Sequence, residues 1–260
     1  MVGDIVGSPG RKACVGIIPR LRDQLQIDFV IANAENVAGG SGITPPTLEE
    51  TFLSGVDVVT SGDHIFRKKA VFPLLEKEPR LLRPINISAT APGSGARVYA
   101  LSDTVKVGVV NGVGRVFMDS VGCPFQGIND AVDIIKQETD IIIVDMHAEA
   151  TSEKIAMGRY LDGKVSAVCG THTHVQTADE RILPGGTAYI SDIGMTGPFD
   201  SVIGREVSPV LQKFTTGVPA YFTVAKNDIR LNGVIVDIDS ETGNAIAISR
   251  VQESLENNAS

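Results

Sequence analysis

Short apolar runs alternate with helical patterns along the N-terminal two-thirds of the chain, and this alternation constrains the fold more than any other feature. It is typical of an α/β domain, in which helices connect the strands of a largely parallel sheet. The strongest strand pattern is Ile141-Ile142-Ile143-Val144, because an unbroken apolar run fits a strand that is buried on both faces. Further strands are expected over residues 29–32, 56–60 and 167–169, and helices over 47–54, 68–76, 128–137 and 152–160.

The flanking segments fit the same α/β domain. A helical pattern follows Ser8-Pro9, and Pro19 is expected to kink or interrupt it. Because no repeat or Pro/Gly/Ser-rich linker interrupts the sequence, we expect one domain over residues 1–252 and a disordered tail over 253–260. The remaining expected strands are a hairpin of 97–101 with 105–110 and a meander of 220–224, 233–238 and 245–251.

Side chains that can bind metals follow five of the expected strands. In an open α/β sheet, ligands bind at the carboxyl ends of the strands, so these side chains should meet at one edge. All four histidines of the chain belong to this group. The group comprises Asp4, Glu35, Asn36, Asp63, His64, His147, His172 and His174.

The mixture of oxygen and nitrogen donors indicates a transition-metal site. Carboxylates suit hard divalent cations, whereas imidazole suits Mn, Fe, Zn or Co. The donors exceed the needs of one tetrahedral ion, but they suit two ions about 3.5–4 Å apart. Taken singly each signal is weak, because a lone histidine is usually structural and a Gly-Asp pair is often only a turn. Their coincidence at five strand ends favours the metal site.

The acidic charge balance limits the partners of the chain. With a net charge of -8, 5% aromatic residues and no tryptophan, neither duplex nor stacked single-stranded nucleic acid is expected as a ligand. A phosphate ligand can still bind where a metal supplies positive charge. No apolar run approaches the roughly 18 residues of a membrane span. No signal-peptide pattern is visible, so we expect a cytoplasmic protein without a membrane partner. Cys14, Cys123 and Cys169 form no Cys-x-x-Cys pair, so neither a disulfide framework nor a structural zinc site is expected.

The candidate donors lie in five longer motifs. These motifs are Val2-Gly3-Asp4-Ile5-Val6-Gly7-Ser8-Pro9-Gly10, Asn33-Ala34-Glu35-Asn36, Gly62-Asp63-His64, His147-Ala148-Glu149-Ala150-Thr151-Ser152-Glu153-Lys154 and Gly170-Thr171-His172-Thr173-His174-Val175-Gln176-Thr177-Ala178-Asp179. In them the chain resembles the YmdB-like bacterial metallophosphoesterases of the calcineurin-like superfamily. The resemblance runs from Val2 to about Arg250.

This resemblance implies a fold, an activity and a set of roles. The fold would be α/β, a four-layer α/β/β/α sandwich of two mixed sheets. The activity would be hydrolysis of 2′,3′- or 3′,5′-cyclic nucleotides by a centre of two divalent metal ions, iron or manganese, in a protein associated with homo-oligomers. By motif matching, the first metal would be held by Asp4, Glu35, Asn36 and His174. The second metal would be held by Glu35, Asp63, His147 and His172, with Glu35 bridging.

In that mechanism, hydroxide generated at the metals attacks phosphorus, and His64 acts as the general acid that protonates the departing ribose oxygen. Two features depart from the family pattern: Asp63 replaces the usual Asn, and only three residues precede Asp4, so the first strand should be short. They favour an alternative function, a regulatory metal- or nucleotide-binding protein with a degenerate site and little activity. A metal hydrolase of other esters or amides is a third candidate.

Overall fold

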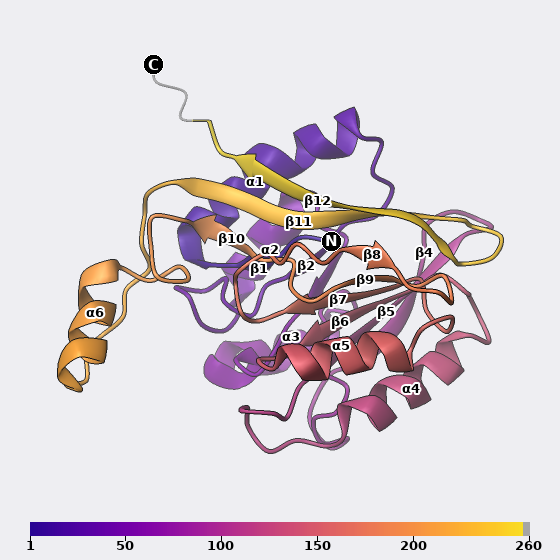
Figure 1. Cartoon of the computed structure of the whole chain (residues 1–260), viewed down its shortest axis with the longest axis horizontal. Helices are drawn as coiled ribbons and strands as arrows, with labels where there is room; N and C mark the ends of the chain where they lie inside the picture. The colour runs from indigo at the N-terminus through magenta and orange to yellow at the C-terminus, as the bar shows by residue number, and fades with distance from the viewer. Residues whose placement is uncertain (257–260) are drawn as a thin grey trace.

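A six-stranded mixed sheet forms one half of the computed structural model, which describes residues 1–256. Its four inner strands run parallel, and its two edge strands pair antiparallel to their neighbours. Helices α4 (Pro124–Ile135) and α5 (Thr151–Tyr160) cover one face of this sheet (Figure 1). In order, the strands are β4 (Ala96–Ala100), β5 (Lys106–Val113), β6 (Ile142–His147), β7 (Ala167–Thr171), β9 (Ala188–Ile190) and β8 (Arg181–Ile182).

Two smaller sheets form the other half. Strands β1 (Asp4–Ile5), β10 (Met195–Pro198), β11 (Ile229–Ile238) and β12 (Ala245–Ser254) pair in that order, and β2 (Ile31–Asn33) pairs with β3 (Val58–Thr60). Val2 joins the two sheets, because it bridges Ala32 on one side and Gly233 on the other. Helix α1 (Gly7–Gln24) packs against β10 and β11 (Figure 1). The remaining helical segments are α2 (Pro45–Leu53), η1 (Ile65–Arg67), η2 (Lys69–Val71), α3 (Phe72–Lys77) and α6 (Val207–Thr216), of which α6 projects from the body.

Three hydrophobic clusters hold these parts together. One fills the space between α1 and the smaller sheets, a second lies beneath α4 and α5, and a third lies between the six-stranded sheet and the smaller sheets. Representative members are Ile17 and Val59, Ile128 and Val144, and Val109 and Val234, respectively. The molecule is therefore a mixed α/β fold with several sheets, as the alternation of apolar runs and helical patterns predicted.

Most expected elements form within a few residues of their predicted bounds, and the hairpin of β4 with β5 and the pairing of β11 with β12 are confirmed. Three local predictions are wrong. The interruption expected at Pro19 does not occur, because α1 continues through this residue; the carbonyl of Val15, which loses its donor, belongs to an exposed residue. Residues 68–76 form η2 and a shorter α3 instead of one helix.

The third wrong prediction is the strand over 220–224. In this segment Tyr221 is exposed, and Val224 forms only an isolated bridge to Arg205. An exposed segment that meets no extended neighbour cannot form a ladder, although its composition suits a strand.

The first residues of the expected tail belong to ordered structure instead. Strand β12 continues through Ser254, and Leu255 packs partly buried against the cluster beneath α1. The rest of the predicted tail, 257–260, lies outside the described residues. Within residues 1–256, no helix has the length and apolar character needed to cross a bilayer.

Candidate metal centre

Strand ends from all three sheets deliver their polar side chains to one place. Asp4 lies on β1, Glu35 and Asn36 follow β2, Asp63 and His64 follow β3, His147 ends β6, and His172 and His174 follow β7. Four of these residues form a tight group in which one donor atom from each lies within 4.8 Å of the others. That group is Glu35, Asp63, His147 and His172.

A second group of donors adjoins the first through Glu35. Its Oε2 lies 3.2 Å from His147 Nε2, whereas its Oε1 lies 2.9 Å from Asn36 Nδ2. His174 Nε2 lies 3.2 Å from Asn36 Nδ2 and 3.9 Å from Asp4 Oδ1. The two carboxylate oxygens of Glu35 therefore face different groups, and every residue predicted from the sequence belongs to one group or borders it.

Two buried carboxylate oxygens in the centre lack a hydrogen-bond partner among the described residues. They are Asp4 Oδ1 and Asp63 Oδ1. Burying a charged oxygen without a partner is costly unless a cation compensates it. Burial raises the pKa of Asp4 to about 6. For Glu35, burial alone would raise the pKa, but the charge of His147 and hydrogen bonds to it hold the pKa well below its usual value.

The histidine of the tight group that is easiest to deprotonate is His172. Burial and the neighbouring His147 lower the pKa of His172 to about 4, so the neutral imidazole that binds metals dominates at neutral pH. Neutral imidazole, ionised carboxylates and orphaned carboxylate oxygens together form a donor set that fits divalent cations.

A hydrogen-bond relay fixes the orientation of His147. Its Nδ1 lies 2.9 Å from Thr171 Oγ1, and that hydroxyl donates to Asp145 Oδ1 at 2.7 Å. Since the hydroxyl proton is used for Asp145, the oxygen of Thr171 must accept from His147 Nδ1–H. When the ring is neutral, its lone pair lies on Nε2 and faces the other donors, as in metal sites where a polar partner fixes the tautomer of a ligating histidine. The charge of Glu35 raises the pKa of His147 despite its burial, so a cation that binds at Nε2 would displace a proton.

The loop that carries His172 and His174 is strained and firmly held. Both residues have positive φ, 98° and 66°, and such non-glycine conformations persist only when their surroundings impose them. Asp192 Oδ2 accepts from Thr173 N at 3.1 Å, from Thr173 Oγ1 at 2.7 Å and from Lys154 Nζ at 2.6 Å. Asp4 Oδ2 accepts from His172 N at 3.1 Å. The fold therefore holds the loop from two sides.

The absence of a side chain at Gly62 also serves the centre. A Cβ at this position would collide with His147 Nε2 and Glu35 Oε2. Glycine here keeps the space in front of the donors open, since any larger residue would push two of them apart.

His64 borders both groups without joining the tight one. Its Nδ1 lies 3.1 Å from Asn36 Oδ1 and 3.4 Å from Glu35 Oε1, and its Nε2 lies 3.5 Å from Asp63 Oδ2. Hydrogen bonding to Glu35 raises the pKa of His64. With its side chain 26% exposed, His64 can both hold a proton and reach a ligand.

Comparison with known proteins shows the family to which the chain belongs. The family model described as "YmdB-like protein" matches residues 1–251. The chain belongs to the YmdB-like family. This confirms the family expected from the five motifs.

Relatives of this YmdB-like chain include a curated protein and two solved structures. The 2′,3′-cyclic-nucleotide 2′-phosphodiesterase of Bacillus subtilis (strain 168) is 43% identical over 250 residues, which covers 96% of this chain and 94% of that protein. A novel phosphatase of Mycoplasma pneumoniae has a TM-score of 0.91 at 34% identity, covering 97% of this chain and 92% of that one. A hypothetical protein of Thermus thermophilus has a TM-score of 0.90 at 39% identity, covering 97% of each chain.

Sequence reasoning missed several residues that hold the YmdB-like site together. Asn33, Thr171, Lys154 and Asp192 act through contacts between elements far apart in sequence, so no local pattern identifies them. Glu153 is another such residue, because it is buried and accepts the backbone N–H groups of Arg115 and Val116. Glu149 Oε2 lies 3.2 Å from His172 Nε2.

Proposed function

We propose that this chain is a metal-dependent phosphodiesterase that hydrolyses cyclic nucleotides, with 2′,3′-cyclic nucleotides as its first substrate class. The observation that carries the proposal is the pair of adjoining donor groups that share Glu35. A relative that covers nearly the whole chain is named 2′,3′-cyclic-nucleotide 2′-phosphodiesterase, which supports the substrate class.

We assign the donors to two divalent ions, with iron or manganese as the metals. Glu35, Asp63, His147 and His172 would hold one ion, and Asp4, Glu35, Asn36 and His174 the other. As a ligand, Asn36 would turn its amide over, because its Nδ2 now faces His174. Bound there, divalent ions would lower the pKa of a water and offset the charge of the phosphate.

The remaining role in this proposal belongs to His64. Its raised pKa favours the protonated imidazole, and its partial exposure leaves it accessible to a substrate oxygen. We assign it as the general acid that gives its proton to the departing ribose oxygen. Asp63 and Asn36, on either side of the ring, orient it.

Further expectations about the fold, the location and the partners belong to the same proposal. The three stacked hydrophobic clusters support the four-layer α/β/β/α sandwich. A cytoplasmic location and a homo-oligomer, both suggested at the level of sequence, stay predictions, as does the absence of nucleic-acid and membrane partners.

The test is hydrolysis of a matched panel of cyclic nucleotides by purified protein loaded with manganese or iron. We expect turnover of 2′,3′-cyclic nucleotides, lost on chelation and restored by metal. The 3′,5′-cyclic isomers in the same panel measure the preference between ring types. Tight nucleotide binding without hydrolysis at any metal concentration would instead support the regulatory alternative, in which the site is degenerate.

A further inference from the structure

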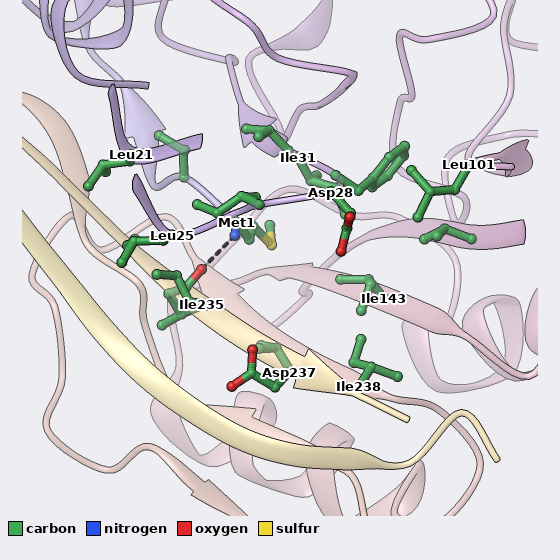
Figure 2. A pocket seen from close by; sticks show the side chains of 18 of the residues that line it. Met1, Leu21, Leu25, Asp28, Ile31, Leu101, Ile143, Ile235, Asp237 and Ile238 are labelled. Carbon is green, nitrogen blue, oxygen red and sulfur yellow. Dashed lines mark hydrogen bonds between the residues drawn. The ribbon is translucent and has the colours of Figure 1, made fainter. Parts of the chain in front are cut away.

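An apolar groove of about 600 Å³ lies between β2 and β11, away from the metal donors. Val105 and Ile143 line it near the amino ends of β5 and β6, whereas the donors follow the carboxyl ends of their strands. The charged side chains of its lining are the carboxylates of Asp28 and Asp237 (Figure 2). Because carboxylates repel an anionic nucleotide, a surface for the base of a substrate is expected at the carboxyl edge instead.

At that edge, residues 114–122 form a loop between β5 and α4 that adjoins the metal centre. Strand β5 pairs with β6 in parallel, and Val113 lies opposite His147. Gly114 N then donates to His147 O at 2.8 Å. A Cβ at Gly114 would collide with the side chain of Ala148. The loop therefore leaves the sheet in close contact with the strand end that supplies His147.

Two buried polar side chains tie this loop down. Asn86 Oδ1 accepts from the backbone N–H of the last residue of β5 at 2.9 Å, and its Nδ2 donates to Gly122 O at 2.9 Å, so the two ends of the loop are held together. Glu153, in the first turn of α5, accepts from Arg115 N at 3.1 Å and from Val116 N at 3.2 Å. Compact loops with tied ends are frequently functional.

Phe117 lies at the tip of the loop in a conformation that phenylalanine does not favour. Met118 N donates to Arg115 O at 3.4 Å, so residues 115–118 form a turn. Phe117 is the third residue of this turn and has a φ of 62°, where glycine or asparagine is usual. It is also 89% exposed, so packing within the chain does not offset the strain. Strained residues of this kind cluster at ligand sites.

We propose that Phe117 is a stacking platform for the nucleobase of the substrate, an inference that rests on the proposed function. Four residues of backbone span at most about 14 Å, so Phe117 stays close to Val113 and to the strand end that carries His147. Val116, which is 41% exposed, extends the apolar surface beside the ring. Every base has a π-face that can stack on an aromatic side chain, so the subsite distinguishes nucleotides from base-free phosphodiesters.

The composition of the chain favours a single stacked base over a longer nucleic acid. Single strands bind to a succession of aromatic side chains along a basic groove. This chain has 5% aromatic residues and a net charge of -8. A mononucleotide whose phosphate lies at the metal centre and whose base lies on Phe117 requires neither feature.

The first test is fluorescence at position 117. The chain contains no tryptophan, so the emission of the Phe117→Trp variant reports on this position alone. Adenosine 3′-phosphate should quench the emission of the manganese-loaded variant, whereas ribose 5-phosphate, which has no base, should not. Phe214→Trp is the matched control, because Phe214 is 76% exposed on α6, which projects from the body. Its emission should respond to neither compound.

The second test separates the ring from the rest of the loop. Phe117→Ala keeps the Cβ and removes the ring, so it should raise KM for 2′,3′-cyclic AMP by about tenfold with kcat nearly unchanged. KM for ribose 2′,3′-cyclic phosphate should stay the same. Phe117→Tyr keeps an aromatic ring and should restore the KM of the nucleotide, and Phe214→Ala should change neither substrate. A misfolded loop would impair both substrates alike and would not be rescued by tyrosine.

Several results would overturn the inference. Turnover of 2′,3′-cyclic AMP without quenching in Phe117→Trp would do so while leaving the proposed function intact, and so would equal rises of KM for the nucleotide and the base-free substrate. Self-association that Phe117→Ala abolishes with unchanged kinetics would make the loop a contact between copies of the chain instead. If the unsubstituted protein neither binds nor hydrolyses a cyclic nucleotide, the proposed function fails, and this inference fails with it.

Discussion

At the scale of single residues, the position of each proton decides what the centre can do. The relay from His147 through Thr171 to Asp145 leaves one ring nitrogen of His147 free to face the other donors. His172 stays neutral at neutral pH because burial and His147 lower its pKa to about 4. For His64 the shift has the opposite direction, since hydrogen bonding to Glu35 raises its pKa. Each of the three imidazoles thus has a different local task.

The role of His64 can be separated from metal binding. His64→Ala should lower turnover of a cyclic nucleotide by about 10²–10⁴ while the metal content stays near normal, because a lost general acid does not remove a ligand. An ester with a good leaving group should lose much less, since its oxygen departs without a proton. Parallel kinetics and elemental analysis check both points, and an equal loss of metal would make His64 a ligand.

Asp63 sets the charge of the centre. It stands where the family usually has Asn, and it adds one negative charge next to the buried carboxylate of Glu35. Asp63→Asn should therefore loosen the second metal, raise turnover at saturating metal and move the basic limb of the pH–rate profile to lower pH. Metal titrations and pH–rate profiles in excess manganese check this. A slower Asn variant with an unchanged profile would show that the site is built around the carboxylate.

Substitutions at Thr171 test the hydrogen-bond relay that runs from His147 through Thr171 to Asp145. Thr171→Val removes the hydroxyl and leaves Asp145 and His147 without their shared partner, which should cost about 1–3 kcal/mol of unfolding free energy. It should also weaken metal binding by about 10–100-fold. Thr171→Ser keeps the hydroxyl and serves as the control in both denaturant unfolding and metal titration. If Val and Ser bind metal equally well, the tautomer of His147 is fixed by another contact.

The same residues show how far sequence reasoning reaches. All eight candidates lie in or beside one centre, because apolar strands reveal where their carboxyl ends are and chemistry identifies the donors that follow. Residues such as Asn33 and Lys154 could not be found this way. Their partners are remote in sequence, at Asp145 and Asp192, and pairing across elements leaves no periodic signal.

At the scale of elements, strands were easier to predict than their surroundings. The strand Ile142–His147 is easy to recognise in the sequence, because a strand that is buried on both faces begins with a continuous run of apolar residues. The segment 220–224 has a similar composition, yet composition does not reveal whether a neighbouring strand exists. Pro19 was misjudged for a related reason: a proline is tolerated where the carbonyl it frees lies on an exposed side of the helix.

One ion pair, between Lys154 of α5 and Asp192, supports the loop that carries His172 and His174, because Asp192 also accepts hydrogen bonds from Thr173 in that loop. Lys154 Nζ lies 2.6 Å from Asp192 Oδ2, and both side chains are at most 3% exposed. Lys154→Met leaves the carboxylate buried without its cation, so it should cost about 3–5 kcal/mol of unfolding free energy. It should also loosen the loop of His172 and His174 and weaken metal binding. Arg20→Met is the control, because the pair of Arg20 with Glu253 is exposed and should be worth less than about 1 kcal/mol.

Denaturant unfolding and metal titration of the two variants measure these effects. Similar losses in the free energy of unfolding for Lys154→Met and Arg20→Met would mean that the buried pair of Lys154 with Asp192 contributes no more to stability than the exposed pair of Arg20 with Glu253. A large loss of stability with unchanged metal affinity would separate the ion pair from the loop, leaving Asp4 and the Thr173 contacts as its main supports.

At the scale of the whole molecule, the centre joins parts of the fold that are otherwise separate. Its donors come from β1, from the turns after β2 and β3, and from β6 and β7 of the six-stranded sheet. Several buried carboxylates therefore meet where the sheets come together, and their mutual repulsion opposes that contact. Cations bound between them should stabilise the folded molecule as a whole, because the donors are dispersed once the chain unfolds.

Metal binding should therefore be measurable in two ways: as the number of ions bound per chain, and as an increase in the free energy of unfolding. Metal-free protein reconstituted with manganese should bind close to two equivalents, since the donors form two groups that share Glu35. At a free metal concentration of 100 times Kd, each site should add about 2.7 kcal/mol of stability, and Tm should rise by several degrees. Elemental analysis and thermal unfolding before and after chelation check both values. Glu35→Gln weakens the shared ligand and should reduce both, whereas a plateau at one equivalent or none in the unsubstituted protein would contradict the dinuclear centre.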